Sequence, residues 1–162
     1  MKPLLSVKNL STRFDTFDGS VYAVNDVNFD LYPGETLAVV GESGSGKSVT
    51  MLSLLGLLAG SKEVKGHAYF SSAGPEVDLL AISKTELNRL RGNMISIIFQ
   101  DALRSLNPVM TIGEQITESL ITHKGYNRKS AYKRAIELLQ MVGILHSFPT
   151  RRSSDLDRKS VV

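Results

Sequence analysis

The stretch Gly41-Glu42-Ser43-Gly44-Ser45-Gly46-Lys47-Ser48 decides the fold of this chain. It fits the pattern Gly-x-x-x-x-Gly-Lys-Ser/Thr in full. The apolar run at residues 36–40 precedes it and predicts a strand buried on both faces. A helix is expected to begin at Gly46 or Lys47 and to end near Leu58. A strand, a glycine-rich loop and a helix in this order predict an α/β fold with a P-loop core.

The loop carries the groups that hold a triphosphate. Its glycines let successive N–H groups point inward at the α- and β-phosphates, and the start of a helix favours anions. Lys47 is expected to reach the β- and γ-phosphates, and the Ser48 hydroxyl is expected to coordinate Mg²⁺. The pattern alone indicates a P-loop nucleoside triphosphatase, a class that includes kinases and GTPases. The alternative without a functional role is a glycine-serine turn with a solvated lysine. It does not explain why a predicted strand and a predicted helix flank the loop.

The residues before the loop predict an antiparallel β subdomain. Residues 4–10 are typical of a strand, and residues 14–20 are typical of a turn. Residues 21–32 alternate in part between apolar and polar side chains, as a half-buried antiparallel strand does. Pro33-Gly34-Glu35 then turns the chain toward the apolar run.

The residues after the loop predict short elements and then two helices. Residues 66–71 indicate a weaker strand, and residues 83–86 form a capping box that opens a short helix to about Arg91. Residues 94–99 predict a second apolar strand, followed by an irregular segment at 100–108. Two amphipathic helices follow, and their apolar positions are Ile112, Ile116, Leu120 and Ile121, then Ala131, Ala135, Leu138, Leu139 and Val142.

The chain resembles the ABC ATPase family, and within it the oligopeptide and dipeptide importer branch, from about residue 4 to residue 144. Besides the loop at 41–48, the resemblance rests on segments in a fixed order: Ala23-Val24-Asn25-Asp26-Val27, residues 34–40, Ile98-Phe99-Gln100-Asp101, Ser105-Leu106-Asn107-Pro108 and residues 111–116. The sequence departs from the branch at Ala102, where a proline commonly follows the Gln-Asp pair. The resemblance implies a helical subdomain that starts at about Thr111.

The resemblance also implies roles for two residues outside the loop. Gln100 would be the Q-loop glutamine, whose side chain reaches Mg²⁺ and the attacking water and relays the nucleotide state to a membrane subunit. Phe14 would stack on adenine, although Phe17 and Tyr22 lie close by and remain alternatives. The expected ligands are ATP and Mg²⁺, and the expected site residues are Phe14, Gly41, Glu42, Ser43, Gly44, Ser45, Gly46, Lys47, Ser48 and Gln100. Lys47 and Gln100 would be catalytic, and Ser48 and Gln100 would contact the metal.

The implied function is that of a motor subunit, which couples ATP binding and hydrolysis to the import of peptides or related solutes. It would work at the cytoplasmic face of the cell membrane. Its partners would be transmembrane permease subunits, a second ATPase subunit in a homodimer or heterodimer and, indirectly, an extracytoplasmic solute-binding protein. Two alternatives stay open: a small P-loop kinase, and a nucleotide-binding module without catalysis.

The composition of the chain excludes several other classes of protein. The 162 residues are 42% hydrophobic and 22% charged, as is usual for a globular protein, and with no cysteine a disulfide scaffold and a thiolate zinc site are excluded. The most apolar stretch, residues 49–59, is too short to span a bilayer. The net charge of +3 comes largely from residues 146–162, so the rest is nearly neutral and no nucleic-acid partner is expected.

The last residues do not continue the helical pattern. Residues 146–156 match the translation of a common sequencing adapter, and residues 157–162 match its reverse complement in the same frame. We therefore expect a partial ABC ATPase nucleotide-binding domain over residues 1–145 and a non-native, disordered tail over residues 146–162. The sequence holds no LSGGQ-type signature, no apolar strand ending in Asp-Glu and no switch histidine. We accordingly expect a truncated domain that is catalytically incomplete by itself.

Overall fold

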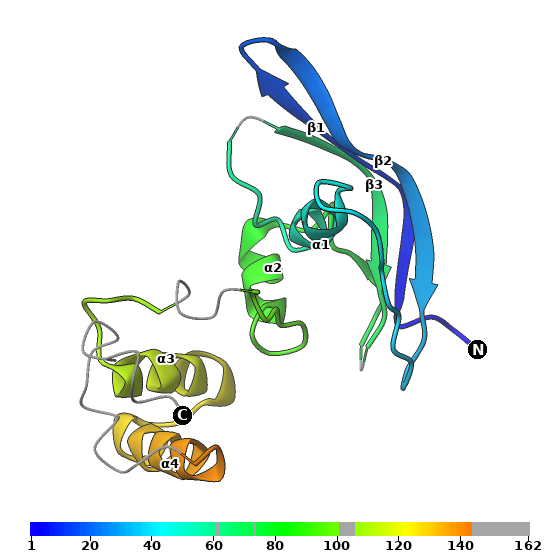
Figure 1. The fold of residues 1–162 in the computed structure, drawn as a ribbon. Helices are drawn as coiled ribbons and strands as arrows, with labels where there is room; N and C mark the ends of the chain where they lie inside the picture. The colour runs from blue at the N-terminus through cyan, green and yellow to red at the C-terminus, as the bar shows by residue number, and fades with distance from the viewer. Residues whose placement is uncertain (61, 73, 101–105, 144–162) are drawn as a thin grey trace. The chain divides into compact units, whose positions relative to one another are not determined.

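A computed structural model describes residues 1–60, 62–72, 74–100 and 106–143 (Figure 1). The chain divides into two compact units, Met1–Asn88 and Arg89–Val162. The first unit holds an antiparallel sheet with a helix on one face, and the second holds a pair of helices. The predicted tail at 146–162 lies outside the described residues. No helix in the described part of the chain has the length and apolar character needed to cross a membrane.

The sheet of the first unit has four strands in the order β2-β1-β3-β4, and every neighbouring pair is antiparallel. The strands are β1 (Leu5–Thr16), β2 (Gly19–Leu31), β3 (Lys62–Phe70) and β4 (Val77–Asp78). The long central strand β1 is therefore paired along both edges. This sheet confirms the predicted N-terminal antiparallel β subdomain.

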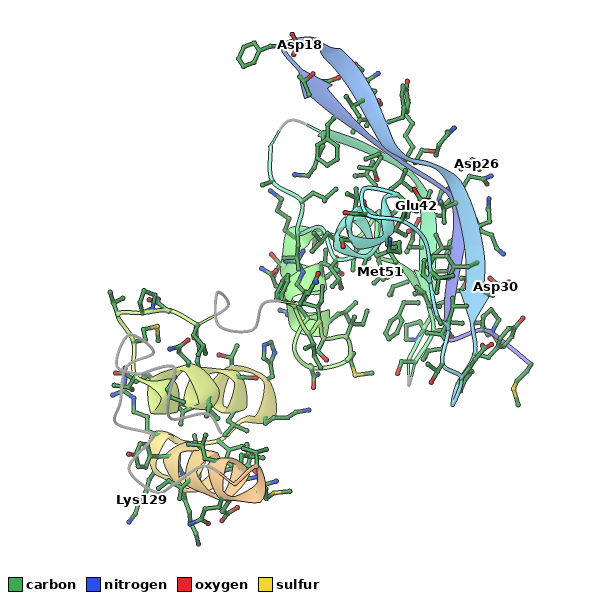
Figure 2. The ribbon with its side chains drawn as sticks, viewed as in Figure 1. Asp18, Asp26, Asp30, Glu42, Met51 and Lys129 are labelled. Atoms are coloured by element: carbon green, nitrogen blue, oxygen red, sulfur yellow. The ribbon has the colours of Figure 1, made fainter. Side chains whose placement is uncertain are left out.

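The first hairpin is longer than the sequence predicts. The expected turn at residues 14–20 is wrong, because β1 continues to Thr16 and only Phe17 and Asp18 form the turn. Phe14 is paired with Val21 on β2 and with Lys62 on β3. Pairing with β2 as far as Thr16, and with β3 as far as Phe14, thus holds in extended form a segment whose Asp and Gly content suggests a turn. Asp18 lies at the tip of this hairpin (Figure 2).

A bulge in β1 explains why its apolar residues do not alternate regularly. Val7 and Leu10 are both fully buried although three positions separate them. Asn9 has a left-handed backbone with φ 52°, and the pairing with β2 shifts by one residue between Val7 and Leu10. Its N–H donates to Asn28 Oδ1 at 2.8 Å, and its Nδ2 donates to Asp26 Oδ1 at 2.8 Å. These side-chain bonds compensate for the ladder bonds that the bulge interrupts.

Helix α1 (Lys47–Leu54) lies against one face of the sheet (Figure 1). It ends four residues earlier than the predicted Leu58, and Gly56 takes a left-handed φ of 58° just beyond its C-cap. Glycine in this conformation is a common helix stop. The core beneath α1 is mainly apolar, and its buried apolar residues include Val7, Leu10, Val24, Leu54, Leu55 and Ala68.

Two predicted strands do not form. Residues 36–40 and 94–99 are all described and none is assigned to a strand, apart from an isolated bridge between Arg91 and Ile95. Val40 is 88% exposed and Ile98 is 95% exposed. An apolar run becomes a strand only where another strand is available to hydrogen-bond with it. Neither segment has a strand neighbour along its length among the described residues, so both stay irregular.

The predicted helices after the sheet are confirmed. Helix α2 (Lys84–Leu90) starts at the expected capping box, in which Ser83 Oγ accepts from Glu86 N–H at 3.2 Å. In the second unit, α3 (Ile112–Lys124) begins with a capping box between Thr111 and Glu114 and ends at Gly125. Helix α4 (Arg128–Met141) follows, with Asn127 as its N-cap and with Ala131, Ala135 and Leu139 buried.

Candidate phosphate-binding loop

The segment at residues 41–46 leads directly into the N-terminus of α1. Gly44 and Gly46 have φ values of 83° and 88°, a left-handed conformation that favours glycine. Gly46 is the N-cap of α1, and no side chain caps this end of the helix. The first N–H groups of a helix have no partner within the helix, and together they carry a partial positive charge. The loop therefore presents an uncapped helix N-terminus suited to an anion.

The ammonium group of Lys47 lies within the loop. Its Nζ donates to Gly41 O at 2.7 Å, to Glu42 O at 2.6 Å and to Ser45 Oγ at 3.1 Å. These three acceptors match the three hydrogens of an ammonium group. The side chain thus returns over its own loop and adds a full positive charge beside the helix N-terminus. A triphosphate here would meet both sources of positive potential.

The loop is held close to the sheet by a contact that only glycine permits. A β-carbon at Gly46 would lie 2.3 Å from Ala23 O, on β2. Ala23 is the extra residue where the pairing of β1 with β2 shifts between Thr12 and Arg13. At Gly41 a β-carbon would lie 2.8 Å from Ser45 Oγ. The narrow space therefore requires glycine at position 46, where the neighbour is backbone, whereas at position 41 the neighbour is a side-chain hydroxyl that can rotate away.

A buried pair of hydroxyl groups joins α1 to β1. Thr12 Oγ1 and Ser53 Oγ are 2.8 Å apart, and the two residues are 0% and 2% exposed. Ser53 Oγ also donates to Val49 O at 2.7 Å. Because a hydroxyl has a single hydrogen, Thr12 must be the donor in the bond between the two side chains. A directed chain of bonds thus runs from the central strand to the first turn of α1.

The three aromatic candidates occupy different places. Phe14 is half-buried and lies two positions after Thr12, in a stretch where the pairing of β1 with β3 has no register shift, so strand alternation puts both on the face that carries α1. Tyr22 is paired with Arg13, which lies between Thr12 and Phe14 on β1, so both Tyr22 and Arg13 are on the other face of the sheet. Interaction with the Tyr22 side chain, together with nearby Asp15 and Glu63, raises the pKa of Arg13. Phe17 is fully exposed at the hairpin tip. Of the three, Phe14 is on the face that carries α1.

The remaining predicted site residues are both exposed. Ser48 is the second residue of α1 and follows Lys47 directly. Gln100 belongs to the second unit, where it ends the irregular segment that replaces the predicted strand at 94–99. Asp101 and Ser105 lie outside the described residues. Phe14, the loop and Ser48 therefore share the first unit, and Gln100 does not.

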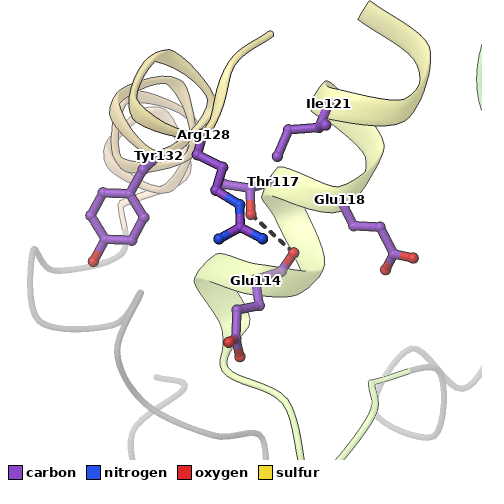
Figure 3. Close-up of a pocket in the computed structure, with 6 residues that line it drawn as sticks. All are labelled: Glu114, Thr117, Glu118, Ile121, Arg128 and Tyr132. Carbon is purple, nitrogen blue, oxygen red and sulfur yellow. Dashed lines mark hydrogen bonds between the residues drawn. The ribbon is translucent and has the colours of Figure 1, made fainter. Parts of the chain in front are cut away.

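The second unit has a pocket that sequence patterns do not reveal. A cavity of about 340 Å³ lies between α3 and α4 (Figure 3). Its lining residues are Glu114, Thr117, Glu118, Ile121, Arg128 and Tyr132. On its α3 side, Thr117 Oγ1 donates to Glu114 O at 3.1 Å. The sequence signal for this pocket is two acids on one predicted helix, Glu114 and Glu118, and Arg128 on the next. Such a pattern is equally typical of a solvated helix surface and therefore does not predict a pocket.

A glycine-rich loop that curls around its own lysine and opens into a helix beside an antiparallel sheet defines a P-loop nucleotide-binding protein. The chain belongs to the ABC transporter family, whose model matches residues 24–158. This membership confirms the resemblance drawn from the sequence and sets aside the small-kinase alternative.

Curated relatives narrow the resemblance further. The chain is 51% identical over 142 residues to an oligopeptide transport ATP-binding protein, OppD, of Haemophilus influenzae. This match covers 88% of this chain and 43% of that protein. It is 44% identical over 167 residues to a dipeptide transport ATP-binding protein, DppD, of Lactococcus lactis. This match covers 98% of this chain and 47% of that protein. The chain thus spans about half the length of the curated relatives it matches.

A solved structure supports the fold class. The chain is similar to a dimeric post-hydrolysis state of the ATP-binding cassette MJ0796 bound to ADP and Pi, with a TM-score of 0.76 and 25% identity. The match covers 94% of this chain and 63% of that one. The predicted α/β class with an N-terminal antiparallel β subdomain is therefore confirmed, although residues 36–40 and 94–99 form no strands here.

Proposed function

We propose that this chain belongs to the ATP-binding subunit of an importer for peptides or related solutes. The support comes from its family, and from relatives that are themselves named oligopeptide and dipeptide transport ATP-binding proteins. The subunit would couple ATP binding and hydrolysis to transport. The observation that carries the proposal is the convergence of the Lys47 ammonium and the uncapped N-terminus of α1 on one loop.

In this proposal the loop binds the phosphates of ATP. The glycines at positions 41, 44 and 46 keep the backbone free of β-carbons, which leaves its N–H groups accessible to phosphate oxygens. Glu42, Ser43 and Ser45 contribute main-chain groups to the same curve. Lys47 would exchange its three present acceptors for β- and γ-phosphate oxygens.

Ser48 fits the role of a Mg²⁺ ligand. Its hydroxyl is exposed, follows Lys47 and lies in the first turn of α1, beside the proposed phosphate site. Hard oxygen donors of this kind suit Mg²⁺, which usually keeps several waters and bridges to phosphates. When bound, Mg²⁺ would neutralise charge on the β- and γ-phosphates. Gln100 would contribute its amide oxygen to the metal and orient the attacking water.

Phe14 would stack on the adenine base. It lies on the α1 face of β1, and stacking on an aromatic ring accepts any base plane with modest specificity. Tyr22 is committed to Arg13 on the other face, which argues against it. A nucleotide bound in this way would touch two elements, the base on β1 and the phosphates on α1.

The proposed partners follow from membership of a transporter family. Transmembrane permease subunits would provide the path for the solute, and this subunit would lie at the cytoplasmic face of the membrane. A second ATPase subunit would complete each nucleotide site, and a dimeric solved relative supports this arrangement. An extracytoplasmic solute-binding protein would act on the permease and contact this subunit only indirectly.

The direct test is a calorimetric titration of the purified chain with Mg·ATP. Lys47→Ala removes the charge that would face the β- and γ-phosphates and should weaken binding at least about tenfold. Lys129→Ala, which removes the same charge from α4, serves as the matched control and should bind like the wild type. Equal affinities for all three proteins would refute the assignment of the loop.

A further inference from the structure

The structure points to a role for a pair of residues that contact no proposed ligand. We propose that Thr12 and Ser53 are positioning residues, which fix the base-stacking strand relative to the phosphate-binding helix. The inference rests on the proposed function, because it takes Phe14 as the base platform and residues 41–48 as the phosphate loop. It assigns a shared function to two buried hydroxyl groups that the site itself does not use.

The pair joins the two elements that a bound nucleotide would bridge. Thr12 lies two residues before Phe14 on β1 and on the same face. Ser53 is six positions after Lys47 on α1, and its bond to Val49 O reaches the helix turn that follows the loop. The bond between Thr12 and Ser53 therefore links the base platform to the helix of the phosphate loop, in addition to the close contact of Gly46 with Ala23.

A polar pair is an unexpected choice at this place. The surrounding core is apolar, with Val7, Leu10 and Val24 at 4% exposure or less. Two apolar side chains of the same shape would be about as stabilising, because burying hydroxyl groups offsets much of what their hydrogen bond contributes. Apolar surfaces, however, allow a helix to slide along a strand, whereas a satisfied buried hydrogen bond specifies one arrangement. The pair thus fixes the position of α1 along β1 more than it adds to the stability of the fold.

Register matters because the ligand binds at two points. Once the phosphates are bound at the loop, stacking of the base on Phe14 adds affinity only if Phe14 lies at the correct distance from the loop. A loosened α1 would still bind a phosphate chain, since that contact is made within the loop and the first turn of the helix. It would lose part of the additional affinity that the adenine contact provides. The pair should therefore affect ATP more than a ligand without a base.

The test compares Mg·ATP with Mg²⁺ and inorganic triphosphate, by titration of the full 162-residue chain. Thr12→Val keeps the shape of the side chain and leaves Ser53 its acceptor at Val49 O, so no buried donor is stranded. We expect the Kd for ATP to rise roughly three- to tenfold and the Kd for triphosphate to change by less than about twofold. Thr12→Ser, which keeps the donor, should restore the wild-type ratio.

Two further variants make the result decisive. Ser53→Ala removes the other end of the bond and should give the same ratio, and the double variant should be no worse than either single one. Thr16→Val removes a hydroxyl from the exposed end of β1 and should behave like the wild type. An unchanged ratio in Thr12→Val, or an equal loss for both ligands, would overturn the positioning role.

The wild-type titrations separate this inference from the function on which it rests. If the wild type binds neither ligand, the proposed function fails and the positioning role fails with it. If the wild type binds both ligands with equal affinity, the base platform at Phe14 is wrong and the inference is overturned, while the phosphate loop stands. Only a wild-type preference for ATP over triphosphate that Thr12→Val reduces supports the proposal.

Discussion

Gly46 and Ala23 approach each other so closely that a β-carbon at Gly46 would lie 2.3 Å from the Ala23 carbonyl oxygen. The two residues are 23 positions apart in the sequence and come from the loop and from β2. The contact occurs where β2 has an extra residue relative to β1. A local irregularity of the sheet thus supplies the surface on which the N-terminus of α1 rests.

Gly46→Ala should therefore be more damaging than Gly44→Ala. Both glycines have a left-handed backbone, but a β-carbon at Gly44 meets nothing within 4 Å. Alanine at position 44 should cost about 1 kcal/mol of unfolding free energy from backbone strain alone. Alanine at position 46 should cost at least about 2 kcal/mol more, because backbone must move. Urea denaturation of the two variants gives the comparison, and equal losses would contradict the contact.

Phe14→Ala should weaken ATP binding while sparing binding of inorganic triphosphate. Loss of one base-stacking contact costs on the order of 1–3 kcal/mol, or about tenfold in Kd. Tyr22→Ala is the matched control, because Tyr22 lies on the opposite face with Arg13 and should not alter either affinity. A loss of ATP affinity in Tyr22→Ala alone would transfer the base platform to Tyr22.

The 162-residue chain should bind Mg·ATP without turning it over. In the proposed function, phosphate binding would use groups within residues 41–48, all of which this sequence contains. The sequence lacks an LSGGQ-type segment and an apolar strand ending in Asp-Glu, and with that strand it lacks the carboxylate that the family resemblance assigns to the activation of water. Removing groups that act together costs orders of magnitude in rate. Phosphate release should stay at the level of Lys47→Ala, and clear turnover above that level would show the missing groups to be dispensable.

Asp78 should make the stability of the β3–β4 pairing depend on pH. Although burial acts to raise it, the pKa of Asp78 is held below its ordinary value of 3.8 by hydrogen bonds from the Ala68 and Leu80 N–H groups and from His67. Oδ1 accepts both N–H bonds, at 3.0 and 3.1 Å, and Oδ2 is 2.7 Å from His67 Nδ1. Since the folded pKa is lowered, the carboxylate stabilises the fold above its unfolded pKa and loses this effect as the pH falls.

Asp78→Asn should therefore be less stable than the wild type near neutral pH, by about 1 kcal/mol. The difference should stay constant above about pH 5 and shrink as the pH falls below about 4. Glu76→Gln removes an acid that forms only an exposed ion pair with Lys2 and should change little at either pH. Chemical denaturation at several pH values checks this, and a difference that grows in acid would contradict the sign.

Deleting residues 146–162 should leave the melting temperature unchanged. The sequence of this segment matches a translated adapter and lacks the periodicity of the helix before it. Deleting residues 128–141 instead would remove the buried face of α4 and should abolish the thermal transition of the second unit. A clear drop in melting temperature on removing only the tail would refute its proposed origin.

The sequence predicts best those elements whose signals are local. The capping boxes at Ser83 and Thr111 mark helix starts because the Glu that completes each box lies within the same turn. The phosphate loop is equally local, since its glycines and Lys47 are contiguous. The strands at 36–40 and 94–99 were wrong because strand formation depends on a neighbour, and an apolar run carries no information about one.

The tertiary links of the site could not be predicted from sequence. Thr12 and Ser53 are 41 positions apart, and each alone is an ordinary polar residue in an element of mixed composition. The contact between Gly46 and Ala23 depends on a shift in strand pairing that alternation does not encode. Phe14 was named from family resemblance, and only the face it shares with Thr12 separates it from Tyr22.

The irregular outer strand also affects how this chain behaves in a crowded solution. β2 is an edge of the four-stranded sheet, and a long, flat edge invites strand addition by another molecule. Asp26 breaks the line of β2 with a left-handed φ of 50°, and Asp30 carries a carboxylate bound to Lys8. A strand from a second chain would therefore find an interrupted and charged edge, where a continuous row of backbone hydrogen bonds cannot form. The left-handed Asp26 and the paired carboxylate of Asp30 thus disfavour addition of a second chain at this edge of the sheet.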